Sequence, residues 1–345
     1  MKNPGWRRPC AIWAISDGRA GNRAQALGLA EALGRRLGPG GAEISERAVT
    51  PTRLGAALPA GLWHALGRHM PRILDVTYDG AGLGPPYPKI AVGAGRRVAP
   101  LVAALRRHGV SAVQILAPQM PLSAFDAVVA PAHDGLEGPA VIETLGAVGR
   151  ITRERIVEEA GRWAPRISPL PPPRIAVLIG GPGGMAPWAR GDDARITAAL
   201  GGLAEAGWTL LVTTSRRTPD AVTSGITAAL ARGPHLIHTG QGDNPYPALL
   251  GHAEAALVTA DSVNMASEAA ASGLPVHILE VGGLSSKARA FHAALADRGI
   301  SRTFTGEIGR WTYPPLAEAD RAATLLIEKL ALPQTAITIP PLRAP

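Results

Sequence analysis

The chain has 345 residues, a formal net charge of +8, 46% apolar residues, 4% aromatic residues and one cysteine. The length exceeds the usual range of a single domain, so we expect two. A single cysteine excludes an internal disulfide and is typical of a reducing compartment. The apolar stretch near the N-terminus is too short for a signal peptide, and no run of about 18 apolar residues predicts a spanning helix. We therefore expect a cytoplasmic protein.

The positive charge has two interpretations. It favours anionic partners such as phosphates, nucleotides or acidic lipid headgroups. It is equally explained by composition, because arginine far outnumbers lysine while alanine and glycine are also abundant. The Lys/Arg runs and interleaved aromatic residues that are typical of nucleic-acid binding do not occur, so no nucleic-acid partner is expected.

Strand and helix patterns alternate through the first half. The apolar run Cys10–Ser16 predicts a strand, and the helical spacing of apolar residues over Gly21–Leu37 predicts a helix. Further strands are predicted at Ile90–Gly93, Ala112–Leu116, Ala127–Ala130 and Val141–Leu145, and further helices at Val98–His108 and 152–163.

A proline-rich stretch divides the chain. Five prolines lie between Pro165 and Pro173, which argues against a helix or central strand and favours an extended linker. We therefore predict an N-terminal domain over 1–163, a linker over 164–173, a C-terminal domain over 174–332 and a tail over 333–345.

The second half repeats the alternation more cleanly. Strands are predicted at Arg174–Gly180, Trp208–Thr213, His235–His238, Ala255–Thr259 and Pro275–Leu279. Helices are predicted at Asp192–Ala206, Pro219–Ala231, Tyr246–Gly251, Ser262–Ser272, Ser286–Arg298 and Leu316–Leu330. Apolar strands that alternate with helices indicate an α/β protein with parallel sheets covered on both faces. The predicted fold is two Rossmann-like domains that face a cleft.

Ligands of open α/β sheets bind beyond the carboxyl ends of the strands, so the residues that follow strands are the candidates. The loop Gly180–Gly184 brings backbone amides and a helix N-terminus to a phosphate, or is a structural turn. It lacks the Lys-Ser/Thr pair of a Walker A loop and is not G-x-G-x-x-G. The turn Thr213–Arg217 follows another strand, and its hydroxyl and guanidinium groups suit a phosphate, or form a polar cap with solvated arginines.

The segment Asp261–Glu268 is the third candidate. Its polar groups crowd a strand-turn-helix unit, and Glu268 lies among apolar residues, where an unpaired carboxylate is costly. A carboxylate there can accept two hydrogen bonds from a ribose diol; the alternative is a solvated helix residue.

Candidate bases occur in the first half. Asp17 follows the first strand, while His133 and Asp134 follow the strand within FDAVVAP. For each of these residues two interpretations stay open: a general base that acts across the cleft, or an ordinary turn residue. The other histidines lack metal-site spacing and no G-x-S-x-G elbow occurs, so zinc-enzyme and hydrolase functions are disfavoured. No metal or cofactor is predicted.

Four segments resemble a known family in order along most of the chain. They are SDGRAGNRAQALGLAEAL, FDAVVAPAHDG, IGGPGG and VTADSVNMASEAAASGLPVHILEV. Together they resemble the plant mitochondrial-fission factor family and its bacterial relatives, a family similar to GT-B glycosyltransferases, notably the lipid-linked N-acetylglucosamine transferase of peptidoglycan synthesis.

The resemblance implies roles for particular residues. Asp17, Gly18 and Gly21 would form a loop on the acceptor side. The histidine that follows the first glycine loop of the peptidoglycan enzyme has no counterpart here, and position 264 is Asn where Ser is expected. A nucleotide-diphosphate sugar would contact Gly180, Gly181, Gly183, Gly184, Ser215, Arg216, Ser262, Asn264, Met265 and Glu268, with Glu268 on the ribose.

Two functions remain open at this point. The first is an inverting, metal-independent glycosyltransferase that uses a nucleotide-sugar donor, with Asp17, His133 or Asp134 as base and a lipid-phosphate or envelope acceptor at the inner face of the membrane. The second is a non-catalytic scaffold that recruits partners at an anionic membrane surface. A nucleotide-sugar epimerase is disfavoured, because no Tyr-x-x-x-Lys pair is present and the glycine loop opens the second half.

Overall fold

The computed structural model describes residues 9–37, 41–53, 57, 59, 61–62, 65, 78–79 and 83–333. They form two compact α/β units. The first unit takes its described residues from Met1–Thr144, Val148–Arg150 and Glu318–Pro345, and the second comprises Leu145–Ala147 and Ile151–Ala317.

The first unit contains a six-stranded sheet of order β2-β1-β5-β6-β7-β8, in which all neighbours are parallel. A short antiparallel pair, β3 and β4, lies outside it. The strands are β1 (Cys10–Ser16), β2 (Ala42–Ala48), β3 (Thr50–Pro51), β4 (Tyr78–Asp79), β5 (Ile90–Ala94), β6 (Ser111–Ile115), β7 (Ala127–Pro131) and β8 (Val141–Thr144). The α-helices are α1 (Ala20–Arg36), α5 (Ala99–Leu105) and α12 (Glu318–Lys329), and three single 3-10 turns span Arg106–His108, Leu122–Ala124 and Ala132–Asp134.

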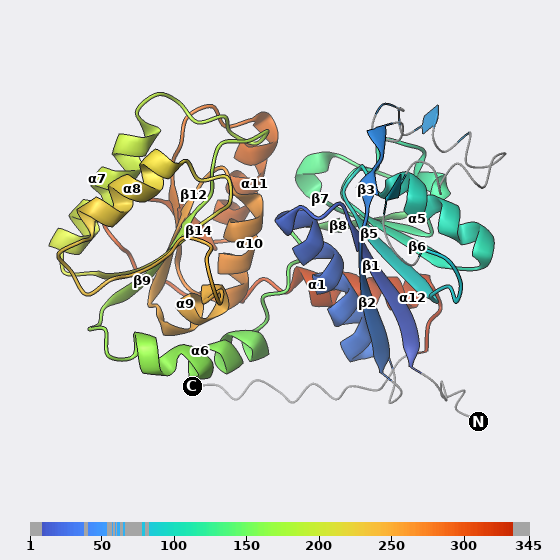
Figure 1. Ribbon diagram of the computed structural model, residues 1–345, viewed down its shortest axis with the longest axis horizontal. Coiled ribbons are helices and arrows are strands. Elements are labelled where there is room, and N and C mark those ends of the chain that lie inside the picture. Colours follow the sequence, from blue (N-terminus) through green and yellow to red (C-terminus); the bar gives the residue numbers. More distant parts are fainter. Residues whose placement is uncertain are drawn as a thin grey trace. The chain divides into compact units, whose positions relative to one another are not determined.

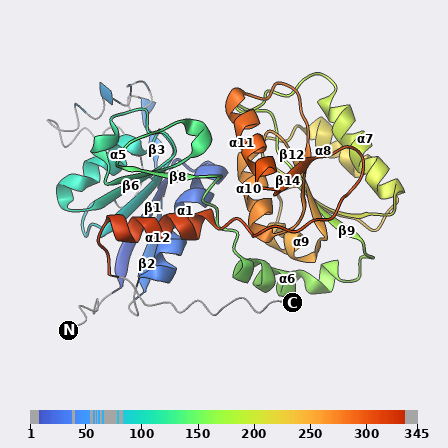
Figure 2. The same cartoon turned by 180° about the vertical axis from the view of Figure 1, so that it is seen from behind.

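Helices cover both faces of this sheet, because alternate residues of each strand point to opposite faces. In β1, Ile12 and Ala14 pack with α1 and α12, whereas Trp13 and Ile15 pack on the α5 side. Figure 2 shows α1 and α12 side by side along one face of the sheet.

The second unit contains a six-stranded parallel sheet of order β11-β10-β9-β12-β13-β14. Its strands are β9 (Arg174–Ile179), β10 (Thr209–Thr214), β11 (Leu236–His238), β12 (Ala255–Thr259), β13 (Val276–Leu279) and β14 (Ser301–Thr303). Its helices are α6 (Arg153–Ile167), α7 (Asp192–Glu205), α8 (Asp220–Ala229), α9 (Tyr246–His252), α10 (Val263–Ser272) and α11 (Ser286–Asp297).

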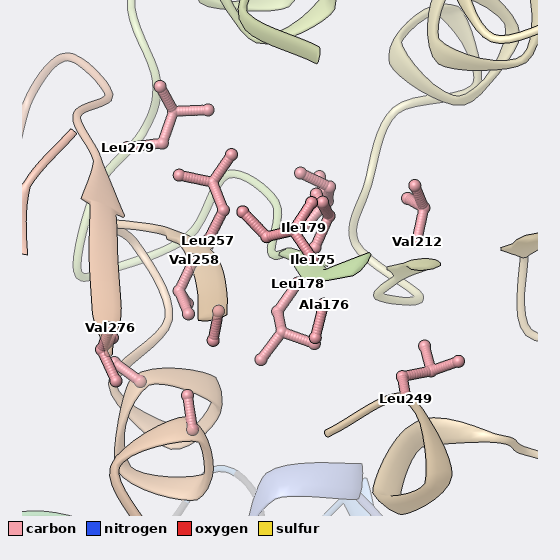
Figure 3. Packing of buried hydrophobic residues seen from close by; sticks show 14 of the residues in the cluster. Ile175, Ala176, Leu178, Ile179, Val212, Leu249, Leu257, Val258, Val276 and Leu279 are labelled. Atoms are coloured by element: carbon pink, nitrogen blue, oxygen red, sulfur yellow. The ribbon is translucent and has the colours of Figure 1, made fainter. Parts of the chain in front are cut away.

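The core of this unit is built almost entirely from aliphatic side chains. Figure 1 shows α7 and α8 on one face of the sheet and α10 and α11 on the other. Ile175, Leu178 and Val258 of the central strands are fully buried between these layers, and Figure 3 shows them in one cluster with Val212 and Leu249. Dense aliphatic packing on both faces explains why the strands are continuously apolar.

These observations confirm the predicted α/β class with two parallel sheets. The sequence missed β2 and β14, and also the short strands β3 and β4. The predicted linker also differs from the structure, because α6 includes Pro165 and ends only at Ile167. Pro165 lies in the last turn of α6, and the helix ends two residues after it.

The unit boundaries also differ from those expected. Helix α6 packs on α9 and belongs to the second unit. Helix α12 returns to the first unit, where Leu326 and Ile327 are buried and Arg35 forms an ion pair with Asp320 at 3.0 Å. Apolar burial against α1 therefore determines where the last helix packs.

Candidate functional site

The carboxyl edge of the second sheet has a topological switch point. The chain runs from β9 outward to β10 and β11, and then returns to place β12 on the other side of β9. Ligands of open α/β sheets bind at such a reversal. The glycine-rich loop follows β9 and the Asp261 segment follows β12, so the two lie together at the switch point.

The loop amides are largely occupied by the protein itself. Gly180 donates its N–H to Thr259 Oγ1 and Gly181 donates to Asp261 Oδ2, both at 2.8 Å. Gly183 donates to the Ala186 carbonyl at 2.8 Å. The predicted cradle of free amides for a phosphate therefore does not form at these three glycines, while Gly184 is exposed.

The turn after β10 closes on the same loop. The Thr218 hydroxyl donates to the Gly180 carbonyl and accepts the Ser215 amide at 2.9 Å. Ser215 Oγ in turn accepts the Arg217 amide at 3.1 Å. Ser215 is thus a turn-forming residue, and Arg216 beside it is exposed.

A buried carboxylate lies at the centre of this edge. The Asp261 side chain is 1% exposed, and its Oδ2 lies 3.6 Å from a guanidinium nitrogen of Arg217. Burial raises its pKa, whereas the Gly181 amide, Thr259, Arg217 and Trp188 lower it. Asp261 Oδ1 is buried, and none of the described groups lies in hydrogen-bonding geometry with it.

Helix α10 begins directly after this carboxylate. Ser262 caps the helix and its hydroxyl accepts the Met265 amide at 3.3 Å. Met265 packs against the core and Asn264 is partly buried. Ser262 and Met265 therefore have structural roles that account for their positions.

Glu268 lies one turn further along α10. Burial raises the pKa of this carboxyl to about 7, although the Tyr246 hydroxyl and Arg155 act in the opposite direction. Tyr246 comes from α9 and Arg155 from α6, so three helices meet at this carboxyl. Sequence reasoning missed both partners, which lie at positions distant from Glu268 in the chain.

The candidate bases lie in the first unit and are not adjacent to one another. Asp17 follows β1, while His133 and Asp134 follow β7. Strands β5 and β6 lie between β1 and β7, which separates the strand ends by about 14 Å at ~4.8 Å per strand. Asp17 is therefore not part of one constellation with His133 and Asp134.

Asp17 has a local role in its own turn. Its Oδ1 accepts hydrogen bonds from Asn22 Nδ2 at 2.9 Å and from the Arg19 amide at 3.3 Å. Its side chain is 3% exposed and lies 3.5 Å from the Arg19 guanidinium. This carboxylate orders the junction of β1 and α1. His133 and Asp134 occupy a single 3-10 turn and are partly buried.

The fold defines the class of protein. The chain superposes on the UDP-GlcNAc 2-epimerase of Methanocaldococcus jannaschii with a TM-score of 0.53 at 11% identity, covering 92% of this chain and 99% of that one. The UDP-GlcNAc 2-epimerase of Neisseria meningitidis gives a TM-score of 0.55 at 11% identity, with coverage of 93% and 99%. These likenesses establish a GT-B fold.

The family follows from sequence. Residues 20–330 match the model of the family described as mitochondrial fission ELM1, and the chain belongs to this family. The mitochondrial fission protein ELM1 of Arabidopsis thaliana is 30% identical over 285 residues, which span 74% of this chain and 66% of the plant protein. A Rickettsia prowazekii protein is 27% identical over 363 residues, with coverage of 91% and 97%. The predicted resemblance is thereby confirmed.

No helix in the described part of the chain combines the length and apolarity needed to cross a bilayer.

Proposed function

We propose that the carboxyl edge of the second sheet binds a nucleotide-sugar, and that the protein is a metal-independent inverting glycosyltransferase for a membrane-associated or envelope acceptor. The observation that carries this proposal is the convergence of three segments, Gly180–Gly184, Ser215–Arg217 and Asp261–Ser262, at the switch point of the sheet. A cationic side chain beside a switch point favours an anionic ligand.

Glu268 supports the same proposal. Glu268 lies at the junction of α6, α9 and α10, and burial of its carboxyl raises the pKa to about 7. Perturbed acids of this kind are enriched at functional sites. We assign it to the ribose diol, where a carboxylate accepts two hydrogen bonds.

Binding is tested by calorimetry and thermal-shift measurements with UDP, GDP, ADP and their sugars. We expect one nucleotide to bind and to stabilise the protein, and we expect Glu268→Gln to weaken that binding without changing the fold. Glu254→Gln, on an exposed ion pair with Arg310, is the matched control. A protein that binds none of these nucleotides contradicts the donor-site proposal.

Catalysis requires a separate test, because a fold does not determine its chemistry. We propose Asp17, His133 or Asp134 as the base. Hydrolysis or transfer of the donor sugar should be lost in one of Asp17→Asn, His133→Gln or Asp134→Asn while nucleotide affinity is retained. If all three variants keep full activity, the base lies elsewhere. Epimerisation of the bound sugar should be measured as well, because two solved proteins of this fold are UDP-GlcNAc 2-epimerases. Epimerisation without transfer would contradict the glycosyltransferase proposal.

The second candidate function is a non-catalytic scaffold at an anionic membrane surface. It is favoured by family membership and by the loop amides of Gly180, Gly181 and Gly183, which are already engaged within the protein. A cytoplasmic protein peripheral to the membrane fits either function. Co-sedimentation with phosphatidylserine vesicles, but not with phosphatidylcholine vesicles, together with no nucleotide binding, would favour the scaffold.

A further inference from the structure

Arg217 crosses the glycine-rich loop in close contact. A Cβ atom on Gly181 would lie closer than 3.0 Å to the backbone carbonyl of Arg217, and one on Gly183 would lie equally close to the guanidinium nitrogen Nη1. Real Cβ atoms essentially never approach other atoms so closely. The glycines at these two positions are therefore explained by the approach of Arg217, before any ligand is considered.

The guanidinium of Arg217 is restrained by a neighbouring carboxylate but remains half exposed. It lies 3.6 Å from Asp261 Oδ2, and its side chain is 49% exposed whereas that of Asp261 is 1% exposed. Within the described part of the chain, the hydrogen bond observed for Arg217 uses its backbone amide, on Ser215 Oγ. The guanidinium is therefore half exposed beside the switch point, and a guanidinium is the side-chain group that binds phosphate oxygens bidentately.

Arg216 differs from its neighbour in this respect. It is exposed, and its side chain makes no hydrogen bond or ion pair with the residues that the structure describes. A side chain that is free in solution loses more rotamer entropy when it binds a ligand than one that is already restrained. Arg217, restrained by a carboxylate, should therefore bind an anion at a lower entropic cost than Arg216.

We propose that Arg217, held over the glycine-rich loop by Asp261, binds the diphosphate of a nucleoside diphosphate at this sheet edge, and that Asp261 is its positioning residue. The inference rests on the proposed nucleotide site and replaces Arg216 as the expected phosphate ligand. It also gives Asp261 a role, since a buried carboxylate next to a diphosphate is tolerated only with a cation between them.

The test is calorimetry on the full chain with UDP, inorganic pyrophosphate and uridine as probes. Arg217→Ala should weaken UDP and pyrophosphate binding about 10-fold or more, because charge-assisted hydrogen bonds are lost, and should leave uridine binding unchanged. Arg217→Lys should recover only part of the affinity, since it lacks the bidentate fork. Arg216→Ala separates the two neighbouring arginines and should change each affinity less than about 3-fold, and Arg232→Ala, at an exposed residue outside the proposed site, is the control.

Asp261→Asn, which preserves shape, tests the positioning role. It should weaken UDP binding in the wild-type background but have no further effect in Arg217→Ala, whereas a purely structural residue would weaken both equally. Urea unfolding of each variant verifies that the fold is retained.

The outcomes separate this inference from the function it rests on. Unchanged UDP affinity in Arg217→Ala, or an equal loss in Arg216→Ala, overturns the inference and leaves the nucleotide site standing. Absence of UDP binding by the wild type overturns both. Loss of binding to phosphatidic-acid vesicles in Arg217→Ala, with UDP binding intact, would assign the arginine to lipid phosphate and overturn the nucleotide assignment.

Discussion

Gly180 and Asp261 are packed so closely that a Cβ atom on Gly180 would overlap the Asp261 carboxylate. The contact joins the ends of β9 and β12, whose Ile175 and Ala255 are in register. Gly180→Ala must therefore move the buried carboxylate or the loop, and we expect it to lower the free energy of unfolding by about 1–3 kcal/mol. Urea denaturation measures this effect.

Gly184→Ala is the matched control, since a Cβ atom there meets nothing within 4 Å. It should change stability by less than about 0.5 kcal/mol. Equal effects of the two substitutions would show that the close packing at Gly180 is not what requires glycine.

Glu268 should make stability depend on pH. Its pKa is about 7 in the folded protein against an ordinary value of 4.5, so the folded state binds the proton more tightly than the unfolded chain does. The resulting stabilisation is complete below pH ~4.5 and is lost as pH rises through about 7, with an upper bound on the order of 3 kcal/mol. Urea unfolding between pH 5 and 8 should show this decline.

Glu268→Gln removes the titrating group and should flatten the profile. Asp261 also has a raised pKa, but from an ordinary value of 3.8, and Arg217 counteracts its burial. The same pH series on Asp261→Asn therefore measures how much of the pH dependence comes from Asp261. A decline that persists unchanged in Glu268→Gln would assign the pH dependence to another group.

Ser267 of α10 forms a hydrogen bond with Ala147, in the short segment Leu145–Ala147 that follows β8. Its hydroxyl accepts the Ala147 amide at 3.0 Å and donates to the Val263 carbonyl at 2.8 Å. Ser267→Ala leaves the Ala147 N–H without its partner, and we expect a loss of about 1–3 kcal/mol in urea unfolding. Thr227→Ala, whose hydroxyl bonds only to Thr223 on an exposed helix face, should cost less than about 0.5 kcal/mol. A similar cost for both would mean that this hydrogen bond is not important for stability.

The sequence predicted the sheets better than their edges. Continuous apolar runs such as Ile175–Ile179 identify central strands, because both faces are buried. Strand β2 (AEISERA) contains Glu43 and the consecutive polar residues Ser45, Glu46 and Arg47, and it lies at an edge, so no such run marks it. The position of α12 depends on burial against α1, across nearly the whole chain, which no local pattern encodes.

The candidate site was predictable in outline only. Gly180–Gly184, Ser215 and Ser262 could be placed at one sheet edge because parallel strands share their carboxyl ends. Which groups would touch could not be predicted, because Gly181 meets Asp261 only through the register of β9 with β12. Consequently the amides expected to bind phosphate are used within the protein, and the position of Arg217 over the loop could be seen only in the structure.

Asp192 anchors the long loop that follows β9. Its buried carboxylate accepts the amides of Ala189 at 2.6 Å and Gly282 at 2.8 Å, and Arg195 pairs with it at 3.0 Å. The loop after β9 is thereby fixed to the loop after β13. Asp192→Ala leaves two backbone N–H groups without partners, and we expect it to cost about 2–4 kcal/mol in urea unfolding.

The neighbouring Asp193 provides the control for Asp192. It is exposed in the same first turn of α7, so both substitutions remove one negative charge from the helix N-terminus. Asp193→Ala should therefore cost only the charge–dipole contribution, about 0.3–1 kcal/mol. If the nucleotide site is as proposed, Asp192→Ala should also weaken UDP binding. The loop after β9 would then keep its hydrogen bonds near Gly181 but lose those of Asp192. Equal stability losses in the two variants would contradict the anchoring role, since only Asp192 contacts both loops.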